Sequence, residues 1–259
     1  MPGEAVERTL FRNEHLLMGE FWCPPESPRW RTLNEVSPSA HVVFPRIRVA
    51  IRHVGREPVL ADRNLVIFYN AGQRFFRTLR DARGDHCYFV EVAPEAWAAL
   101  TCEEGGPELA FAYGPSDPAV YLLQHAAIAH LREQRCDSLL VEENLAEAVA
   151  RAIADARAFH SRRRRPRRRS TSAAHRNLAD EAKELLGERL GERLTLAEIA
   201  SALCTTKYHL ARVFRASTGF SLHGYRNQLR LRVALERLAD PQTLVSALAH
   251  ELGYVSHSI

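Results

Sequence analysis

The stretch LTLAEIASALCTTKYHLARVFRASTG, residues 194–219, decides how the C-terminal part of this chain folds. Thr195 and Glu198 have the spacing of a capping box, and apolar residues follow at helical intervals: Leu196, Ile199, Ala200 and Leu203. A first short helix is therefore predicted to start near Ala197. Thr206 is placed to cap a second helix, whose apolar stripe is formed by Leu210, Val213 and Phe214.

The second helix is predicted to turn a polar and basic face outward, formed by Lys207, Tyr208, Ala211, Arg212 and Arg215. The small side chain of Ala200 lets the two helix axes approach closely. A pair of this kind typically places its second helix in a major groove of DNA. The alternative is a helical hairpin in an ordinary bundle, in which the same side chains form only a solvated face.

The pattern then begins again. A long amphipathic helix is predicted from about His223 to Leu238, with an inward stripe of Tyr225, Leu229, Ala234, Leu235 and Leu238. A further first helix and turn follow, marked by Leu244, Leu248, Ala249, Leu252 and Gly253. Ser256 stands where Thr206 stood. Two such units on one connecting helix are able to reach major-groove faces about 34 Å apart.

Several segments, TKYHLARVFRASTGFS, LRLRVALERL and ALAHELGYVSHS, occur in an order and spacing that resemble a known family. Over roughly residues 175–259 the chain resembles the DNA-binding domain of the AraC/XylS family of bacterial transcription regulators. The resemblance implies double-stranded DNA as the partner, with Tyr208, Ala211 and Arg212 facing bases. Lys207 and Arg215 are then expected nearer phosphates, next to the capping residue Thr206. These six residues are the predicted DNA-binding set.

Two features depart from that pattern. Cys204 stands where the second turn has Gly253, so the first turn is expected to be less sharply bent. The chain ends at Ile259, three residues past Ser256, so the second recognition helix is expected to be incomplete and the stripe Leu244, Leu248 and Leu252 to lack its cover. Weakened operator binding is the expected consequence. An alternative is a truncated protein that dimerises without productive DNA binding.

Charge is divided unevenly along the chain. Residues 1–160 hold 17 Lys and Arg against 22 Asp and Glu, a net charge of −5, whereas residues 161–259 hold 18 against 9, a net charge of +9. A basic part joined to an acidic part is typical of a nucleic-acid reader with a separate sensing domain. Seven Arg residues cluster within SRRRRPRRRSTS, residues 161–172, and predict an extended linker over 161–174.

The N-terminal part reads as short strands followed by helices. HVVFP, IRVAIRH, NLVIFYN, QRFFRTL and HCYFVEV, between residues 41 and 92, are β-branched or aromatic runs separated by turn residues. Many short strands with close turns predict a small barrel or jelly roll, and the family resemblance implies a cupin-like sensing and dimerisation domain over residues 1–160. The expected fold is therefore α+β with two domains: this barrel with helices, then an all-α double helix-turn-helix domain whose second unit is incomplete.

Helical periodicity predicts two helices, at 117–133 and 137–160, which either cover the barrel or pair with their twins in a homodimer. For the dimer, the close approach is expected at Ala146, Ala148, Ala150 and Ala152. Aromatic candidates for an effector pocket are equally candidates for the core, so no effector site is assigned: Trp22, Trp30, Phe44, Phe68, Phe75 and Phe89.

An alternative hypothesis, from a different functional class, is that the chain is a cupin-type metalloenzyme. Such a site needs several His and a carboxylate on one metal, but His41, His53 and His86 are isolated and Glu57 lies in a probable turn. No catalytic residue, metal ligand or cofactor is therefore predicted. Cys23 and Cys87 are interpreted as buried apolar residues, with a thiol sensor or soft-metal site as the alternative. Neither an apolar span of 18 residues nor a signal peptide is recognised, so cytoplasmic location is expected.

Overall fold

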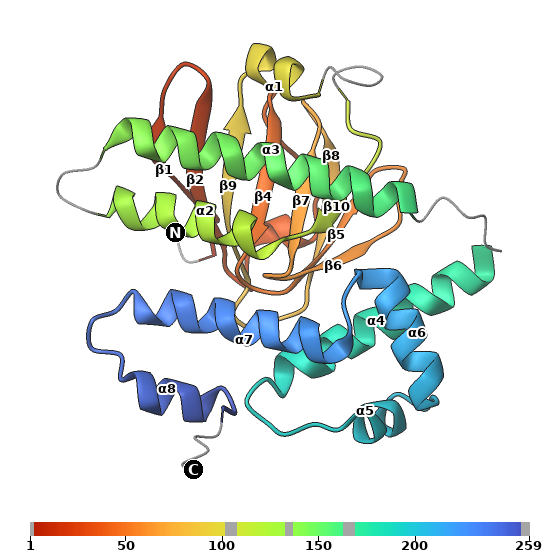
Figure 1. Cartoon of the computed structure of the whole chain (residues 1–259). Coiled ribbons are helices and arrows are strands. Elements are labelled where there is room, and N and C mark those ends of the chain that lie inside the picture. Colours follow the sequence, from red (N-terminus) through yellow and green to blue (C-terminus); the bar gives the residue numbers. More distant parts are fainter. Residues whose placement is uncertain (1–2, 102–107, 133–136, 163–168, 255–259) are drawn as a thin grey trace. The chain divides into compact units, whose positions relative to one another are not determined.

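The structure is a computed structural model that describes residues 3–101, 108–132, 137–162 and 169–254. The chain divides into two compact units, Met1–Ser161 and Arg162–Ile259. Unit 1 carries the strands and unit 2 is helical (Figure 1). Each unit has its own apolar core.

The described strands of unit 1 form two antiparallel sheets. In chain order they are β1 (Val6–Arg12), β2 (Leu16–Cys23), β3 (Asn34–Glu35), β4 (Ala40–Pro45), β5 (Val49–His53), β6 (Val59–Ala61), β7 (Leu65–Tyr69), β8 (Arg74–Leu79), β9 (Asp85–Val92) and β10 (Tyr113–Pro115). One sheet has the order β1-β2-β9-β4-β7-β10 and the other β3-β8-β5-β6. Strands β2 to β9 thus have the order β2-β9-β4-β7 in one sheet and β3-β8-β5-β6 in the other, which is the strand order of an eight-stranded jelly roll, the architecture of cupins. The predicted jelly roll is confirmed.

Strand β7 shows how one apolar run serves two cores. All five of its residues are buried. Leu65, Ile67 and Tyr69 belong to the core between the two sheets, whereas Val66 and Phe68 belong to the core under the helices. Because alternate side chains of a strand point to opposite faces, a strand covered on both faces is apolar throughout.

Three helices cover the outer face of the larger sheet (Figure 1): α1 (Pro94–Thr101), α2 (Pro118–Leu131) and α3 (Ser138–Arg162). A Cβ atom on Gly114 would lie 2.5 Å from the Cβ of Ala156, so α3 approaches β10 as closely as small residues allow. Ala148 and Ala152 of α3 are fully buried within unit 1. The expectation that the alanines at 146–152 form a surface for a twin helix is therefore wrong for these two, because they pack inward.

Unit 2 contains α4 (Arg169–Glu188), α5 (Leu196–Ala202), α6 (Lys207–Thr218), α7 (Leu222–Leu238) and α8 (Val245–Glu251). Ala179, Ala182 and Leu186 of α4 belong to the same core as the helices that follow. The expected extended linker 161–174 is helical at both ends, because α3 continues to Arg162 and α4 starts at Arg169. Residues 163–168 lie outside the described part of the chain.

Strands β1, β2, β3, β6 and β10 and helices α1 and α4 were not predicted from sequence. In β2, Gly19 interrupts the strand pattern, yet it is required there. A Cβ on Gly19 would overlap the ring of Phe89, the residue paired with it on β9. Among the described helices none is long and apolar enough to cross a membrane.

Candidate nucleic-acid interface

Helix α5 begins with the predicted capping box. The Thr195 hydroxyl accepts a hydrogen bond from the backbone N–H of Glu198 (3.2 Å), and the Glu198 carboxylate accepts one from the backbone N–H of Thr195 (2.7 Å). These bonds satisfy N–H groups that have no partner inside the helix, and this fixes where it starts. Ile199 and Ala200 are buried against the core of unit 2.

The turn between α5 and α6 is tighter than the sequence suggested. Cys204 has a φ of 50°, within the left-handed region, and Thr205 donates its backbone N–H to the carbonyl of Ala200 (2.9 Å). The expectation of a less sharply bent turn is wrong, because Cys204 adopts the conformation that glycine would provide. This conformation costs a residue with a Cβ about 1–2 kcal/mol.

Helix α6 carries the predicted DNA-binding set. The Thr206 hydroxyl accepts from the backbone N–H of His209 (3.3 Å), and the stripe Leu210, Val213 and Phe214 is buried. The side chains of Thr206, Lys207, Tyr208, Arg212 and Arg215 are exposed, with Tyr208 at 86%. Ala211 differs from the expectation of an outward residue, because it is half-buried and packs partly against the core.

His209 connects this surface to α4. Its ring contacts the ring of His175 on α4 edge-on, with centroids 5.5 Å apart, as expected for a packing residue. The guanidinium of Arg212 lies 3.4 Å from Nδ1 of the same imidazole, through Nη2. His209 therefore also helps to orient Arg212 on the exposed face.

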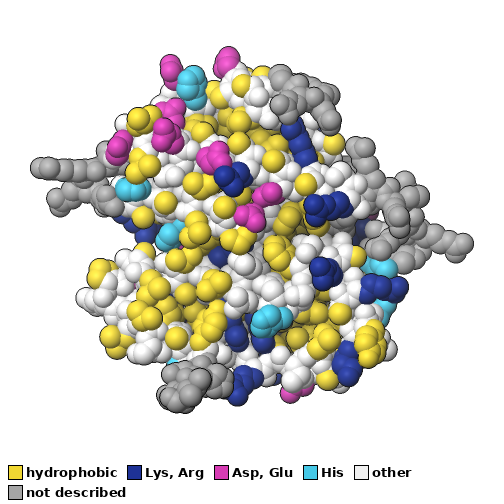
Figure 2. All heavy atoms as spheres, viewed as in Figure 1, with side chains coloured by type: hydrophobic (Ala, Val, Ile, Leu, Met, Phe, Trp, Pro, Cys, Tyr) yellow, Lys and Arg dark blue, Asp and Glu magenta, His cyan; other side chains and the backbone are white. Residues whose placement is uncertain are grey.

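Three residues at the start of α7 lie beside α6 and were missed by the sequence analysis. Ser221, His223 and Arg226 line a groove of about 300 Å³, together with Ala211 and Arg215. The Ser221 hydroxyl accepts from the backbone N–H of Gly224 (3.1 Å) and so caps α7. The available signal was a serine just after the helix-ending Gly219 and followed by His and Arg. Lys and Arg side chains also gather on the face of unit 2 seen in Figure 2.

The second helix-turn unit, which consists of α8 and the turn at Gly253, repeats the geometry of α5 and the turn at Cys204. Gly253 has a φ of 75°, and Tyr254 donates its backbone N–H to the carbonyl of Ala249 (2.9 Å), as Thr205 does to Ala200. Leu248 and Leu252 are buried, so the expectation of an uncovered stripe is wrong for them and holds only for Leu244, which is 72% exposed. Ser256 lies outside the described residues.

Two arginines inside α7, which are not part of the predicted inward stripe, are buried. Arg230 donates from Nε to the carbonyl of Leu190 (2.8 Å) and from Nη2 to that of Glu192 (3.1 Å). It thereby fixes the loop between α4 and α5, against which the Gly253 turn also packs. Arg232 is 1% exposed, whereas Leu238, expected inward, is 41% exposed.

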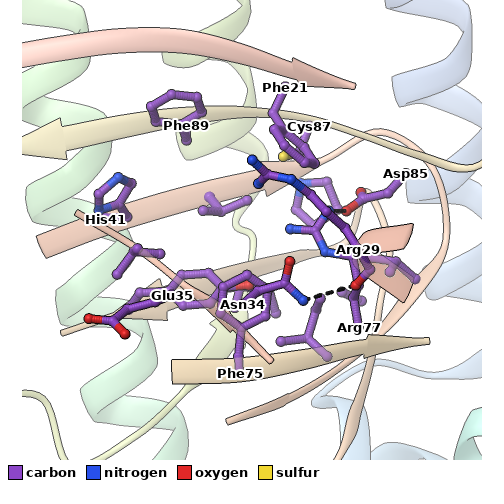
Figure 3. Close-up of a pocket in the computed structure, with 18 of the residues that line it drawn as sticks. Phe21, Arg29, Asn34, Glu35, His41, Phe75, Arg77, Asp85, Cys87 and Phe89 are labelled. Carbon is purple, nitrogen blue, oxygen red and sulfur yellow. Dashed lines mark hydrogen bonds and ion pairs between the residues drawn. The ribbon is translucent and has the colours of Figure 1, made fainter. Parts of the chain in front are cut away.

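Unit 1 encloses a cavity of about 170 Å³ between its two sheets (Figure 3). Arg77 on β8 and Asp85 on β9 form a buried ion pair at one end (3.0 Å). Of the aromatic candidates, Phe75 and Phe89 line the cavity. Phe44 and Phe68 belong to the core under the helices, and Trp22 is 38% exposed.

The candidate metal ligands remain separate. His41 lies 3.7 Å from Glu91 and His86 lies 3.0 Å from Glu20, while His53 packs on Tyr69. Within the described ranges, no three His, Cys, Asp or Glu side chains gather as a metal site would require. Cys23 and Cys87 are buried, and burial raises the pKa of the Cys87 thiol.

One comparison with known proteins agrees with the C-terminal resemblance. Residues 199–258 match the family "Helix-turn-helix domain". Among solved structures, the chain is similar to an apo ToxT variant from Vibrio cholerae (11% identity, TM-score 0.39, 94% of this chain and 90% of that chain). A cupin domain from Bordetella pertussis is also similar (14% identity, TM-score 0.28, 34% of this chain and 93% of that chain). No curated protein matches the chain.

Proposed function

We propose that the chain is a sequence-specific, DNA-binding transcription regulator of the AraC type whose jelly roll senses a small-molecule effector, because residues 199–258 match a helix-turn-helix family. The observation that carries the proposal is α6, a capped helix with a buried apolar stripe and an exposed basic face. Such a helix is able to enter a major groove with its N-terminal residues near base edges.

Roles within α6 are proposed from its geometry. Arg212 is exposed and oriented by His209, and an arginine can donate two hydrogen bonds to a guanine edge. Tyr208 is the most exposed large apolar side chain of the helix and is proposed to contact bases. Lys207 and Arg215, with Thr206 at the cap, are proposed to contact phosphates. Ala211, half-buried, offers at most a methyl contact.

Phosphate contact is proposed to extend to α7. Ser221, His223 and Arg226 lie in its first turns beside Arg215. The N-terminus of a helix attracts anions through its free N–H groups and its dipole, and two nearby guanidinium groups strengthen that attraction. Basic side chains there would anchor the backbone while α6 reads bases.

The test is selection of duplexes from a random DNA pool by the full chain, followed by titration of the selected sequence at fixed salt. The proposal expects an enriched motif, and Arg212→Ala is expected to weaken binding by about 1–3 kcal/mol and to relax one base position. Arg237→Ala is the matched control, an exposed arginine of unit 2 that pairs with Glu251 away from α6. Selection without an enriched motif would refute the proposal.

Effector binding and a homodimer are further parts of the proposal. The cavity of unit 1 supports the first. Leu122 on α2 and Leu139 on α3 are 51% and 62% exposed, and they are the proposed apolar contact between two copies. Sedimentation of the full chain with Leu122→Glu and Leu139→Glu tests the dimer, which is expected to dissociate. As a promoter-binding protein, it is proposed to act in the cytoplasm.

A further inference from the structure

The cavity of unit 1 is lined by charges of opposite sign at its two ends. Strand β9 runs along it and turns alternate residues inward, from Asp85 through Cys87 and Phe89 to Glu91. At about 3.3 Å per residue, the Cα atoms of Asp85 and Glu91 are about 20 Å apart. Figure 3 shows Arg29, Arg77 and Asp85 at one end and Glu35 and His41 at the other.

The first end carries an excess of positive charge. Arg77 is 6% exposed, and its guanidinium stacks between the rings of Phe21 (4.5 Å) and Phe75 (5.3 Å). Asp85 neutralises Arg77. Arg29, which also faces Phe21 at 5.8 Å, has no ion-pair partner among the residues that the structure describes.

This end also has open hydrogen-bonding positions. Nε of Arg77 and Oδ1 of Asp85 are buried and have no hydrogen-bond partner in the described structure. Nε of Arg77 is a donor, so a ligand carboxylate that bonds to it relieves the cost of leaving that donor unpaired, whereas Oδ1 of Asp85 is an acceptor and bonds only to a donor. A carboxylate placed between Arg29 and Arg77 accepts from both, which stabilises its charge.

The second end carries an excess of negative charge. Glu91 faces His41 at 3.7 Å, but burial lowers the pKa of His41, so the imidazole is neutral near pH 7. Glu35 is exposed and has no ion-pair partner within the described ranges. Away from this end, Glu7 lines the wall next to Phe21, which pairs with Cys87, and adds a further negative charge to the lining as a whole. A purely anionic ligand is therefore repelled by most of the lining.

Between the two ends the lining is apolar, formed by Val43, Val49, Ile51, Ala61, Ile67 and Phe89. The volume of about 170 Å³ is close to that of an apolar cavity, about 150 Å³, that accepts benzene. A ligand body of about six carbon atoms therefore fits.

We propose that the jelly-roll cavity binds a small zwitterion, an ω-amino carboxylic acid with an apolar body, whose carboxylate lies at Arg29 and Arg77 and whose ammonium lies at Glu35 and Glu91. The ligand is neutral overall, and each of its charges meets the opposite charge. This inference rests on the proposed function where it makes the zwitterion the effector, but the binding itself is a property of unit 1.

The experiment is calorimetric titration of the full chain with 6-aminohexanoate, hexanoate and hexylamine. One molecule of 6-aminohexanoate is expected to bind per chain, with an affinity at least about tenfold higher than that of the other two probes, because each of those lacks one charge. Arg29→Met is expected to weaken 6-aminohexanoate roughly tenfold without changing hexylamine, and Glu35→Gln to weaken it similarly without changing hexanoate. Both side chains are exposed, so the fold tolerates the changes.

Matched controls are Arg52→Met and Glu14→Gln, which are expected to leave all three affinities unchanged. Arg52 stacks on Phe76 (4.6 Å) and is exposed on β5, and Glu14 lies in the β1–β2 turn. The inference is overturned if hexanoate or hexylamine binds as tightly as 6-aminohexanoate, if none of the probes binds, or if the two cavity variants behave like the controls. Zwitterion binding without an enriched DNA motif would instead refute only the proposed function.

Discussion

Cys204 and Gly253 occupy the same position in the two helix-turn units, and both have a positive φ, 50° and 75°. In each turn the next residue donates its backbone N–H to the carbonyl five positions back, Thr205 to Ala200 and Tyr254 to Ala249. One backbone geometry is therefore built once with a residue that has a Cβ and once with glycine. The two positions should respond to substitution with opposite signs.

Cys204→Gly is expected to stabilise unit 2 by about 0.5–1 kcal/mol. The strain of the left-handed backbone at Cys204 is removed, and this gain exceeds the loss that comes from the greater entropy of glycine in the unfolded chain. Gly253→Ala is expected to destabilise unit 2 by more than about 1 kcal/mol, because the new Cβ would clash with the Gly191 carbonyl and Arg230. Urea unfolding followed by circular dichroism measures both. Equal effects of the same sign would contradict the shared geometry.

Lys207 and Arg212 should differ in how they act on DNA. If Lys207 contacts a phosphate, Lys207→Ala should reduce the slope of log affinity against log salt by about 0.9 and weaken all sequences alike. Arg212→Ala should instead lose discrimination at one base pair. Titrations of the selected duplex and of a scrambled duplex over a salt series separate the two effects. A specificity change on Lys207→Ala would argue against its assignment to phosphate.

Gly19 should control the size of the cavity without touching its charges. The ring of Phe89, which lines the cavity, occupies the space that a Cβ at Gly19 would fill. Gly19→Ala is therefore expected to push the ring into the cavity and to weaken 6-aminohexanoate and hexanoate equally, roughly tenfold. Calorimetry with both probes checks this. Selective loss of one probe would show that Phe89 does not set the volume.

His53 should make unit 1 sensitive to acid. It is 3% exposed, packed on Tyr69 and Phe75, and burial lowers its pKa to about 4. The unfolded chain then binds a proton more readily than the folded chain, so the contribution of His53 to stability is full above about pH 6.5 and is lost as the pH falls toward 4.

His53→Leu replaces this titrating group with an apolar side chain of similar size. As the pH falls from 7 to 4, the unfolding free energy of the variant is expected to rise by a few kcal/mol relative to that of the wild type. Urea unfolding at several pH values provides the measurement. A difference that stays constant with pH would show that His53 does not titrate in this way.

The sequence was informative wherever the signal is local. The capping box at Thr195 and the buried stripe of α6 are set by residues three or four positions apart, so they were predicted correctly. The strands β4, β5 and β7 to β9 were found because β-branched and aromatic runs separated by turn residues are also local patterns.

Predictions from the sequence failed where contacts between residues far apart in the chain decide the structure. Strand β2 contains a glycine that only makes sense against Phe89 on β9. Arg230 is buried because carbonyls of the α4–α5 loop accept its hydrogen bonds. Ala148 and Ala152 face inward because the sheet needs a close helix. None of these partners is near in sequence, so no periodicity reveals them.

The amino-acid sequence alone determined the helix-turn-helix surface, because the cap, the apolar stripe and the basic face of α6 all lie within residues 206–219. What only the tertiary structure decided is the cavity of unit 1. Arg29, Arg77, Asp85, Glu35 and Glu91 come from a short 3-10 helix (Pro28–Trp30) and three strands, and the jelly roll alone brings them around one space. Backbone hydrogen bonds between neighbours specify helices locally, whereas a cavity exists only when separate strands have paired.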